Sequence, residues 1–108
     1  MKYLSRPEEL VLLAIWKIKD EPYGVRIRQH ISELTGKYWS IGSIYVPLDR
    51  LEYKGFVTSY LADPTAERGG KSKRYYKLTD KGLEELRAIQ KIYETFWDDL
   101  PDLSQEKA

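Results

Sequence analysis

The segment from Ser40 to Gly82 constrains the fold more than any other, because a short helix runs directly into a hairpin of concentrated positive charge. Small and hydroxyl residues open the segment, apolar residues follow at helical spacing, and Gly55 is suited to end the helix. β-Branched and aromatic residues then predict a strand at 56–61 and a return strand at 73–78, with Asp-Pro and Gly-Gly pairs between them. We therefore expect a helix followed by a β-hairpin at the centre of the chain.

Two further helices are predicted before this segment and one after it. Ser5 and Glu8 form a capping pattern for a helix that continues to about Lys19, and a second helix is expected over about 23–34. Thr79 is the expected cap of the last helix. The apolar residues of that helix repeat at steps of three and four: Leu86, Ile89, Tyr93, Phe96 and Leu100.

The resulting order of helix, helix, helix, strand, strand, helix predicts a fold that is α+β and mainly α. It is the order of a winged helix-turn-helix, three helices plus a β-hairpin wing, here with a C-terminal dimerisation helix. We assign 1–79 to the DNA-binding domain, 80–100 to the dimerisation helix packed on it, and 101–108 to a flexible acidic tail. Pro47 is unfavourable inside the third helix, so a kink or a late helix start is expected there.

The distribution of charge says more than its sum. The net charge of +1 gives the whole molecule no attraction to nucleic acid, but six basic residues oppose two acidic ones over 67–81. Over 94–108 five acidic residues oppose a single lysine. A basic hairpin alone is also compatible with a solvated sheet edge, where lysine discourages edge-to-edge pairing. Because this hairpin follows a short helix with an uncharged first turn, DNA binding is the favoured interpretation.

The expected DNA contacts lie in the first turns of the third helix and in the wing. Small residues allow the helix N-terminus to approach the DNA backbone, where its free N–H groups can receive a phosphate. Asp49 and Glu52 would repel DNA, which confines the contacts to the first turn and a half. Tyr45 has an alternative role, packing against Tyr23 or the wing. The candidate DNA-binding residues are Tyr23, Ser40, Gly42, Ser43, Tyr45, Lys54, Arg68, Lys71, Lys73 and Arg74.

The residue inventory argues against catalysis and against a metal or other cofactor. The chain has no cysteine, and His30 is its only histidine, so it lacks the ligands of a transition-metal site. Gly70-Lys71-Ser72 resembles the end of a phosphate-binding loop, but the required earlier glycine is replaced by Thr65 and a strand follows in place of a helix. The longest apolar run, residues 10–16, is too short to cross a bilayer, and no signal peptide is recognisable, so we expect a cytoplasmic protein that is not an enzyme.

The last helix carries a second hypothesis, because its aromatic end would protrude from so small a domain. Exposed apolar patches of this kind mark interfaces, and a two-fold dimer would place two recognition helices about one DNA turn apart. The alternative is an ordinary amphipathic helix packed on its own domain. The expected dimer interface comprises Leu86, Ile89, Tyr93, Phe96, Trp97 and Leu100. An aromatic effector pocket at the dimer seam would use Trp16, Phe96 and Trp97, although packing alone explains these aromatics equally well.

Four groups of residues, spread over nearly the whole chain, resemble the PadR-type transcriptional regulators. They are Tyr23-Gly24; Gly42-Ser43-Ile44-Tyr45; Leu48-x-Arg50-Leu51-Glu52-x-x-Gly55-Phe56-Val57; and Arg74-Tyr75-Tyr76-x-Leu78-Thr79-x-x-Gly82. The resemblance implies a bacterial winged-helix repressor that binds palindromic operators as a homodimer through its C-terminal helices and is released by small, often aromatic effectors. The chain is similar to the short-tailed members, which have one C-terminal helix. It departs from the family pattern in having Val46 directly after Tyr45, where the family usually has proline.

Two functions therefore remain. The first is a sequence-specific transcriptional regulator: a homodimeric repressor that binds double-stranded DNA at an inverted-repeat operator. The second is a winged-helix module that binds another protein and never meets DNA.

Overall fold

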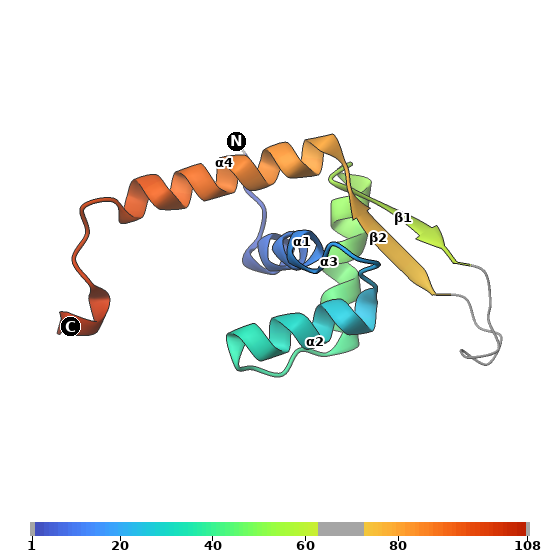
Figure 1. The fold of residues 1–108 in the computed structure, drawn as a ribbon, viewed down its shortest axis with the longest axis horizontal. Coiled ribbons are helices and arrows are strands. Elements are labelled where there is room, and N and C mark those ends of the chain that lie inside the picture. The colour runs from blue at the N-terminus through green and yellow to red at the C-terminus, as the bar shows by residue number, and fades with distance from the viewer. Residues whose placement is uncertain (1, 63–72, 108) are drawn as a thin grey trace.

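Four helices and a two-stranded sheet make up the computed structural model, which describes residues 2–62 and 73–107 (Figure 1). In chain order the elements are α1 (Arg6–Ile18), α2 (Gly24–Thr35), α3 (Ile41–Tyr53), β1 (Val57–Leu61), β2 (Arg74–Leu78), α4 (Asp80–Trp97) and the 3₁₀-helix η2 (Leu103–Gln105). The predicted fold and order of elements are confirmed.

Helix α1 lies at the centre of the core. Its start is fixed by a capping box, in which Ser5 and Glu8 each accept a hydrogen bond from the other's backbone N–H. The helix packs on α2, α3, β2 and α4. The apolar side chains buried together come from six elements and the turn before β1: Val11, Leu12, Ala14, Ile15, Ile27, Ile31, Ile44, Leu48, Leu51, Phe56, Val57, Tyr76 and Leu86.

The wing is a pair of antiparallel strands, and one isolated β-bridge joins a further segment to its edge. Strands β1 and β2 pair from Val57 opposite Leu78 to Leu61 opposite Arg74. The segment before α2 adds to β2, because Tyr23 bridges Tyr75 and the Tyr76 N–H donates to the Pro22 carbonyl over 2.9 Å. This bridge joins the N-terminus of α2 to the wing, and no local pattern in the sequence indicates it. Residues 63–72, which include Arg68 and Lys71, lie outside the described part of the chain.

Helix α3 starts earlier than Pro47 suggested. Ser40 is the N-cap, and the helix runs from Ile41 through Pro47 to Tyr53, so of the two expected alternatives, a kink or a late start, the late start is wrong. Proline has no N–H to donate to the Ser43 carbonyl, one turn back. The proline ring is instead buried, as is the next residue, Leu48. Burial of the ring offsets the loss of one backbone hydrogen bond.

The start of α4 is fixed by a close joint with the turn after α3. The Thr79 hydroxyl donates to the Gly55 carbonyl over 2.7 Å and accepts from the Gly82 N–H over 3.0 Å. Gly55 has φ +84°, a left-handed conformation that favours glycine. A Cβ at Gly82 would lie 2.1 Å from the Phe56 carbonyl oxygen, so only glycine allows this approach. Two groups of the quoted sequence pattern therefore meet in one joint.

The second half of α4 projects away from the domain. Leu86 and Ile89 are buried, at 7% and 8% exposure, whereas every residue from Gln90 to Lys107 is exposed. Figure 1 shows the helix extending past α1 toward the C-terminus, and the molecule measures 55 × 28 × 21 Å. The helix ends at Trp97, so Leu100 lies beyond it, and the segment expected to be a frayed tail contains the turn η2.

Candidate nucleic-acid interface

The first turn of α3 presents small polar residues to solvent. The Ser40 hydroxyl accepts the Ser43 N–H over 3.1 Å, and the Ser43 hydroxyl donates to the Ser40 carbonyl over 2.7 Å. A Cβ at Gly42 would meet nothing within 4 Å. This turn carries no acidic residue, so the positive end of the helix dipole is not opposed there. The arrangement suits the approach of an anionic backbone.

Tyr45 lies partly over the N-terminus of α2. Its side chain is 39% exposed, and a Cβ at Gly24 would lie only 2.5 Å from its hydroxyl oxygen. Gly24, the residue after Tyr23, therefore makes room for this ring, and part of the ring remains exposed to solvent. The sequence alternatives of packing and DNA contact are both compatible with this position.

An aromatic row connects α2 to the wing and carries a lysine. The rings of Tyr23 and Tyr75 meet edge to face with centroids 5.9 Å apart, and Tyr60 lies 5.6 Å from Tyr75 on the other side. The Lys73 ammonium lies 4.0 Å from the centroid of the Tyr23 ring. The structure thus brings two of the predicted DNA-binding residues, Tyr23 and Lys73, together beside the start of β2.

Arg74 belongs to a small polar network between the wing and α3. Its Nη1 donates to the Ser59 hydroxyl over 2.9 Å, and that hydroxyl donates to the Glu52 carboxylate over 2.7 Å. The acid that was expected to repel DNA is therefore held against the wing beside a guanidinium. Such proximity lessens the local negative potential.

Lys54, one of the predicted DNA-binding residues, forms an ion pair within its own domain. Its ammonium lies 2.7 Å from the Glu8 carboxylate, and Glu8 is only 3% exposed. Burial alone would raise the pKa of Glu8, but the hydrogen bonds from Lys54 and from Ser5 outweigh it and hold the pKa below its ordinary value. Because leaving this buried carboxylate unpaired would be costly, the Lys54 ammonium has a structural role, and its contact with DNA stays a prediction.

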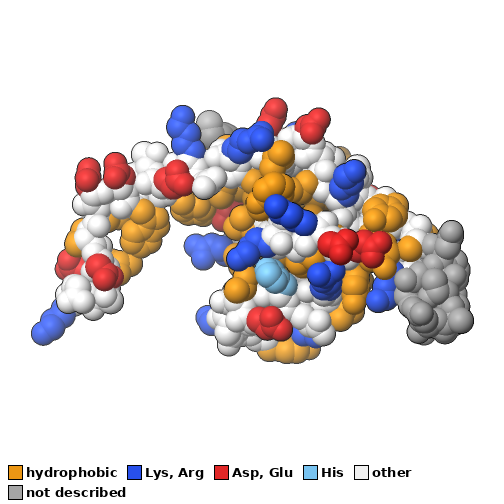
Figure 2. All heavy atoms as spheres, in the orientation of Figure 1, with side chains coloured by type: hydrophobic (Ala, Val, Ile, Leu, Met, Phe, Trp, Pro, Cys, Tyr) orange, Lys and Arg blue, Asp and Glu red, His pale blue; other side chains and the backbone are white. Residues whose placement is uncertain are grey.

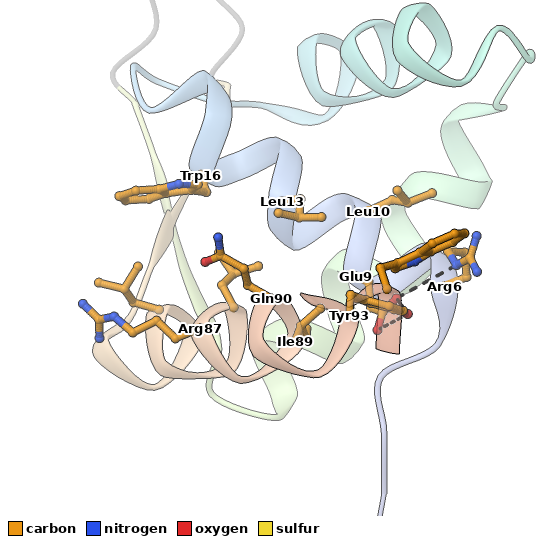
Figure 3. Close-up of a pocket in the computed structure, with 12 residues that line it drawn as sticks. Arg6, Glu9, Leu10, Leu13, Trp16, Arg87, Ile89, Gln90 and Tyr93 are labelled. Atoms are coloured by element: carbon orange, nitrogen blue, oxygen red, sulfur yellow. Dashed lines mark hydrogen bonds and ion pairs between the residues drawn. The ribbon is translucent and has the colours of Figure 1, made fainter. Parts of the chain in front are cut away.

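A second feature, the α1–α4 cavity, has a volume of about 800 Å³ (Figure 3). Leu10 and Leu13 of α1 face Ile89 and Gln90 of α4 across it. It is lined by Arg6, Glu9, Leu10, Leu13, Trp16, Leu83, Leu86, Arg87, Ile89, Gln90, Tyr93 and Trp97. A neighbouring cavity of about 960 Å³ adjoins it and includes Phe96. Of the three expected effector-pocket residues, Trp16 and Trp97 share the first cavity, and Trp97 alone lines both.

One polar contact joins α1 and α4 across this cavity, and the sequence pattern did not predict it. The Tyr93 hydroxyl donates to both Glu9 carboxylate oxygens, over 2.9 and 3.2 Å, and the bond raises the pKa of Tyr93. Arg6 Nε lies 4.0 Å from the same carboxylate. The two partners are 84 positions apart, so no local pattern could have paired them.

Within residues 2–62 and 73–107 no group of three or more histidine or acidic side chains is placed to hold a metal ion. In the same residues no helix combines the length and the apolar character needed to span a membrane.

Comparison with models of protein families assigns the chain to a family. Residues 12–88 match the model of the transcriptional regulator PadR-like family. The chain belongs to the PadR-like family. Its members are transcriptional regulators, so this chain is a regulator and not an enzyme. A search of curated proteins found no match.

Several solved structures resemble the chain over most of its length. A PadR-like transcriptional regulator from Bacillus cereus is 26% identical, with a TM-score of 0.72 over 93% of this chain and 92% of that one. A PadR family transcription regulator from Clostridium difficile is 25% identical, with a TM-score of 0.66 over 85% and 90%. The complex structure of hsRosR-S1, from H. salinarum, is 23% identical and shares the fold, with a TM-score of 0.72 over 89% and 79%.

Proposed function

We propose that this PadR-like regulator is a homodimeric repressor that binds double-stranded DNA at an inverted-repeat operator. The open first turn of α3 carries the proposal. Gly42 is exposed in a helix, where glycine is unfavourable, yet neither its backbone angle nor a neighbouring side chain requires it. A surface that leaves this space free suits close contact with something outside the chain, and DNA fits the uncharged, hydroxyl-rich turn.

The wing supplies the phosphate contacts in this proposal. Lys73 and Arg74 lie at the start of β2, and Lys71 falls outside the described residues. Lysine and arginine at a wing neutralise phosphates and release counterions, which gives affinity that falls steeply with salt. Ser40, Gly42, Ser43 and Tyr45 then face the groove, where bases are read.

The homodimer is proposed to form through the projecting half of α4. Leu86 and Ile89 are already covered by their own domain, so the interface is reduced to the exposed residues further along. These are Ile92, Tyr93, Phe96, Trp97 and Leu100. Large exposed aromatic residues on one helix are the composition expected of a dimer core. A two-fold axis through them gives two recognition helices, which matches an inverted repeat.

A small aromatic effector is proposed to bind in the α1–α4 cavity. Its volume lies within the range of small-molecule sites, and two tryptophans line it. Titration with planar aromatic compounds should quench the fluorescence of the wild type, and replacing Trp16 with Phe should reduce the quenching amplitude. Quenching that is unchanged in both Trp16→Phe and Trp97→Phe would place the ligand elsewhere.

The decisive experiment selects genomic DNA fragments with the protein and measures their retardation at increasing salt. We expect retention of fragments that contain an inverted repeat, with affinity lost over a rise from about 50 to 200 mM salt. Joint replacement of Lys71, Lys73 and Arg74 by Ala should weaken binding to all sequences. Joint replacement of Lys17, Lys91 and Lys107 by Ala changes the net charge equally and should have little effect. Absence of duplex binding at low salt would favour the protein-interaction module instead.

A further inference from the structure

The segment after α4, residues 98–107, is here called the C-terminal arm. Leu103 is 63% exposed, and the arm's hydrogen bonds among the described residues join only near neighbours, as in Ser104 N–H to Asp102. Figure 1 shows the arm turning away at the free end of α4. It carries four acidic residues and one basic one: Asp98, Asp99, Asp102, Glu106 and Lys107. The arm thus presents an exposed apolar side chain, Leu103, among acidic residues, and Leu103 is not covered by the rest of the described chain.

The α1–α4 cavity is complementary to this arm. Its walls are largely apolar, and Figure 3 shows Arg87 near one end and Arg6 near the other. The charged lining residues are two arginines and one carboxylate, and that carboxylate, Glu9, lies 4.0 Å from Arg6 Nε. The net charge of the lining is therefore positive. The cavity therefore suits an apolar side chain flanked by carboxylates.

Dimer geometry lets the arm of one copy reach the cavity of the other. An antiparallel pair of α4 helices with its symmetry axis between Tyr93 and Phe96 places the partner's copy of residue 87 about 8 Å beyond Trp97 along the helix. The six residues from Trp97 to Leu103 can span up to about 20 Å, which is more than enough. A parallel pair would instead set two acidic arms side by side, where they repel.

We propose that in the homodimer each C-terminal arm lies in the α1–α4 cavity of the second copy, with Leu103 among the apolar residues and the acidic residues near Arg6 and Arg87. This inference rests on the proposed homodimer and the exposed half of α4. It has a consequence for regulation: arm and aromatic ligand occupy the same cavity, so a ligand would displace the arm and loosen the dimer.

The absence of cysteine from the chain allows a direct cross-linking test. A variant with Gln90→Cys, in the cavity wall, and Leu103→Cys, in the arm, should form a disulfide-linked dimer under mild oxidation. The matched control combines Leu103→Cys with Glu84→Cys, because Glu84 is exposed on α4 but lines neither cavity. The control and Leu103→Cys alone should remain largely uncrosslinked on a non-reducing gel.

Sedimentation of untagged protein provides the second measurement. A chain that ends at Leu100 should have a dimer dissociation constant raised about tenfold, and Leu103→Asp should act in the same direction, with the circular-dichroism spectrum of each unchanged. If the dimer dissociation constant is the same in the wild type and in both variants, the arm proposal is overturned. So does equal cross-linking in the Glu84→Cys control, or a disulfide within one chain. A full-length chain that stays monomeric at every concentration overturns the proposed homodimer as well.

Discussion

At the scale of single residues, Gly82 and Gly42 differ in whether the fold requires a glycine at that position. Gly82 lies against the Phe56 carbonyl, where a Cβ would come within 2.1 Å of the oxygen. Gly42 lies in open space at the start of α3. The first is required by packing within the chain and the second by nothing within the described chain, which separates a structural glycine from a candidate contact.

Gly82→Ala should lower the free energy of unfolding by about 2 kcal/mol, because backbone must move to relieve the overlap. Gly42→Ala should leave that free energy unchanged or raise it by up to about 1 kcal/mol, since alanine is the better helix former. Urea denaturation followed by circular dichroism measures both. In retardation assays Gly42→Ala should weaken DNA binding about tenfold, and unchanged binding would contradict a close approach at this turn.

The Glu8–Lys54 pair predicts a dependence of stability on pH. Lys54→Met should cost about 2 kcal/mol near neutral pH, because the buried Glu8 carboxylate loses its charged partner. The folded pKa of Glu8 is depressed, so its stabilisation is complete above the ordinary value of 4.5 and is lost as pH falls through the folded pKa. The difference between wild type and variant should therefore narrow below about pH 4.5, as measured by denaturation at several pH values; a constant difference would argue against this pairing.

At the scale of elements, the position of α4 depends on one joint and one bridge. The Thr79–Gly82 joint fixes its first turn, and Leu86 and Ile89 bury its first half. Beyond them the Tyr93–Glu9 hydrogen bonds connect the exposed half to α1. The projecting half is therefore tied to α1 by a polar contact that the sequence pattern did not reveal.

Tyr93→Phe removes these hydrogen bonds and keeps the ring. Because the second half of α4 then lacks its polar tie to α1, hydrogen exchange of the amides in residues 90–97 should become faster. The amides of α2 provide an internal reference and should exchange as before. Equal protection of α4 in both proteins would show that apolar contacts alone hold the helix.

At the scale of the whole molecule, the elongated shape separates two surfaces. The α3 turn and the wing form one, and the exposed aromatic half of α4 forms the other, projecting from the domain (Figure 2). In Figure 2 the hydrophobic side chains along this projection face the hollow between the helix and the body of the molecule. In the proposed homodimer, contact through this half of α4 would leave the α3 turn and the wing of each copy accessible to DNA.

Joint replacement of Phe96 and Trp97 by Glu should yield a folded monomer, because both side chains are exposed in one chain and contribute little to its core. Sedimentation should show the loss of the dimer, and DNA affinity should fall by a factor of ten or more because one half-site contact is lost. Thr95→Glu changes an exposed residue of the same helix that lines neither cavity, and should leave the dimer intact. A dimer that survives the double change would place the interface elsewhere.

The sequence by itself determined the order and approximate bounds of the helices and strands, the localised charge of the wing and the family pattern. These depend on caps, periodicity and composition, which act between near neighbours. Only the tertiary structure decided which candidates share a surface. It paired Lys54 with Glu8, buried Leu86 and Ile89 within their own domain, joined Tyr23 to the wing and linked Tyr93 to Glu9. The physical reason is that burial and pairing depend on contacts between residues far apart in the chain, and the same amphipathic spacing allows a residue to face its own core or a partner.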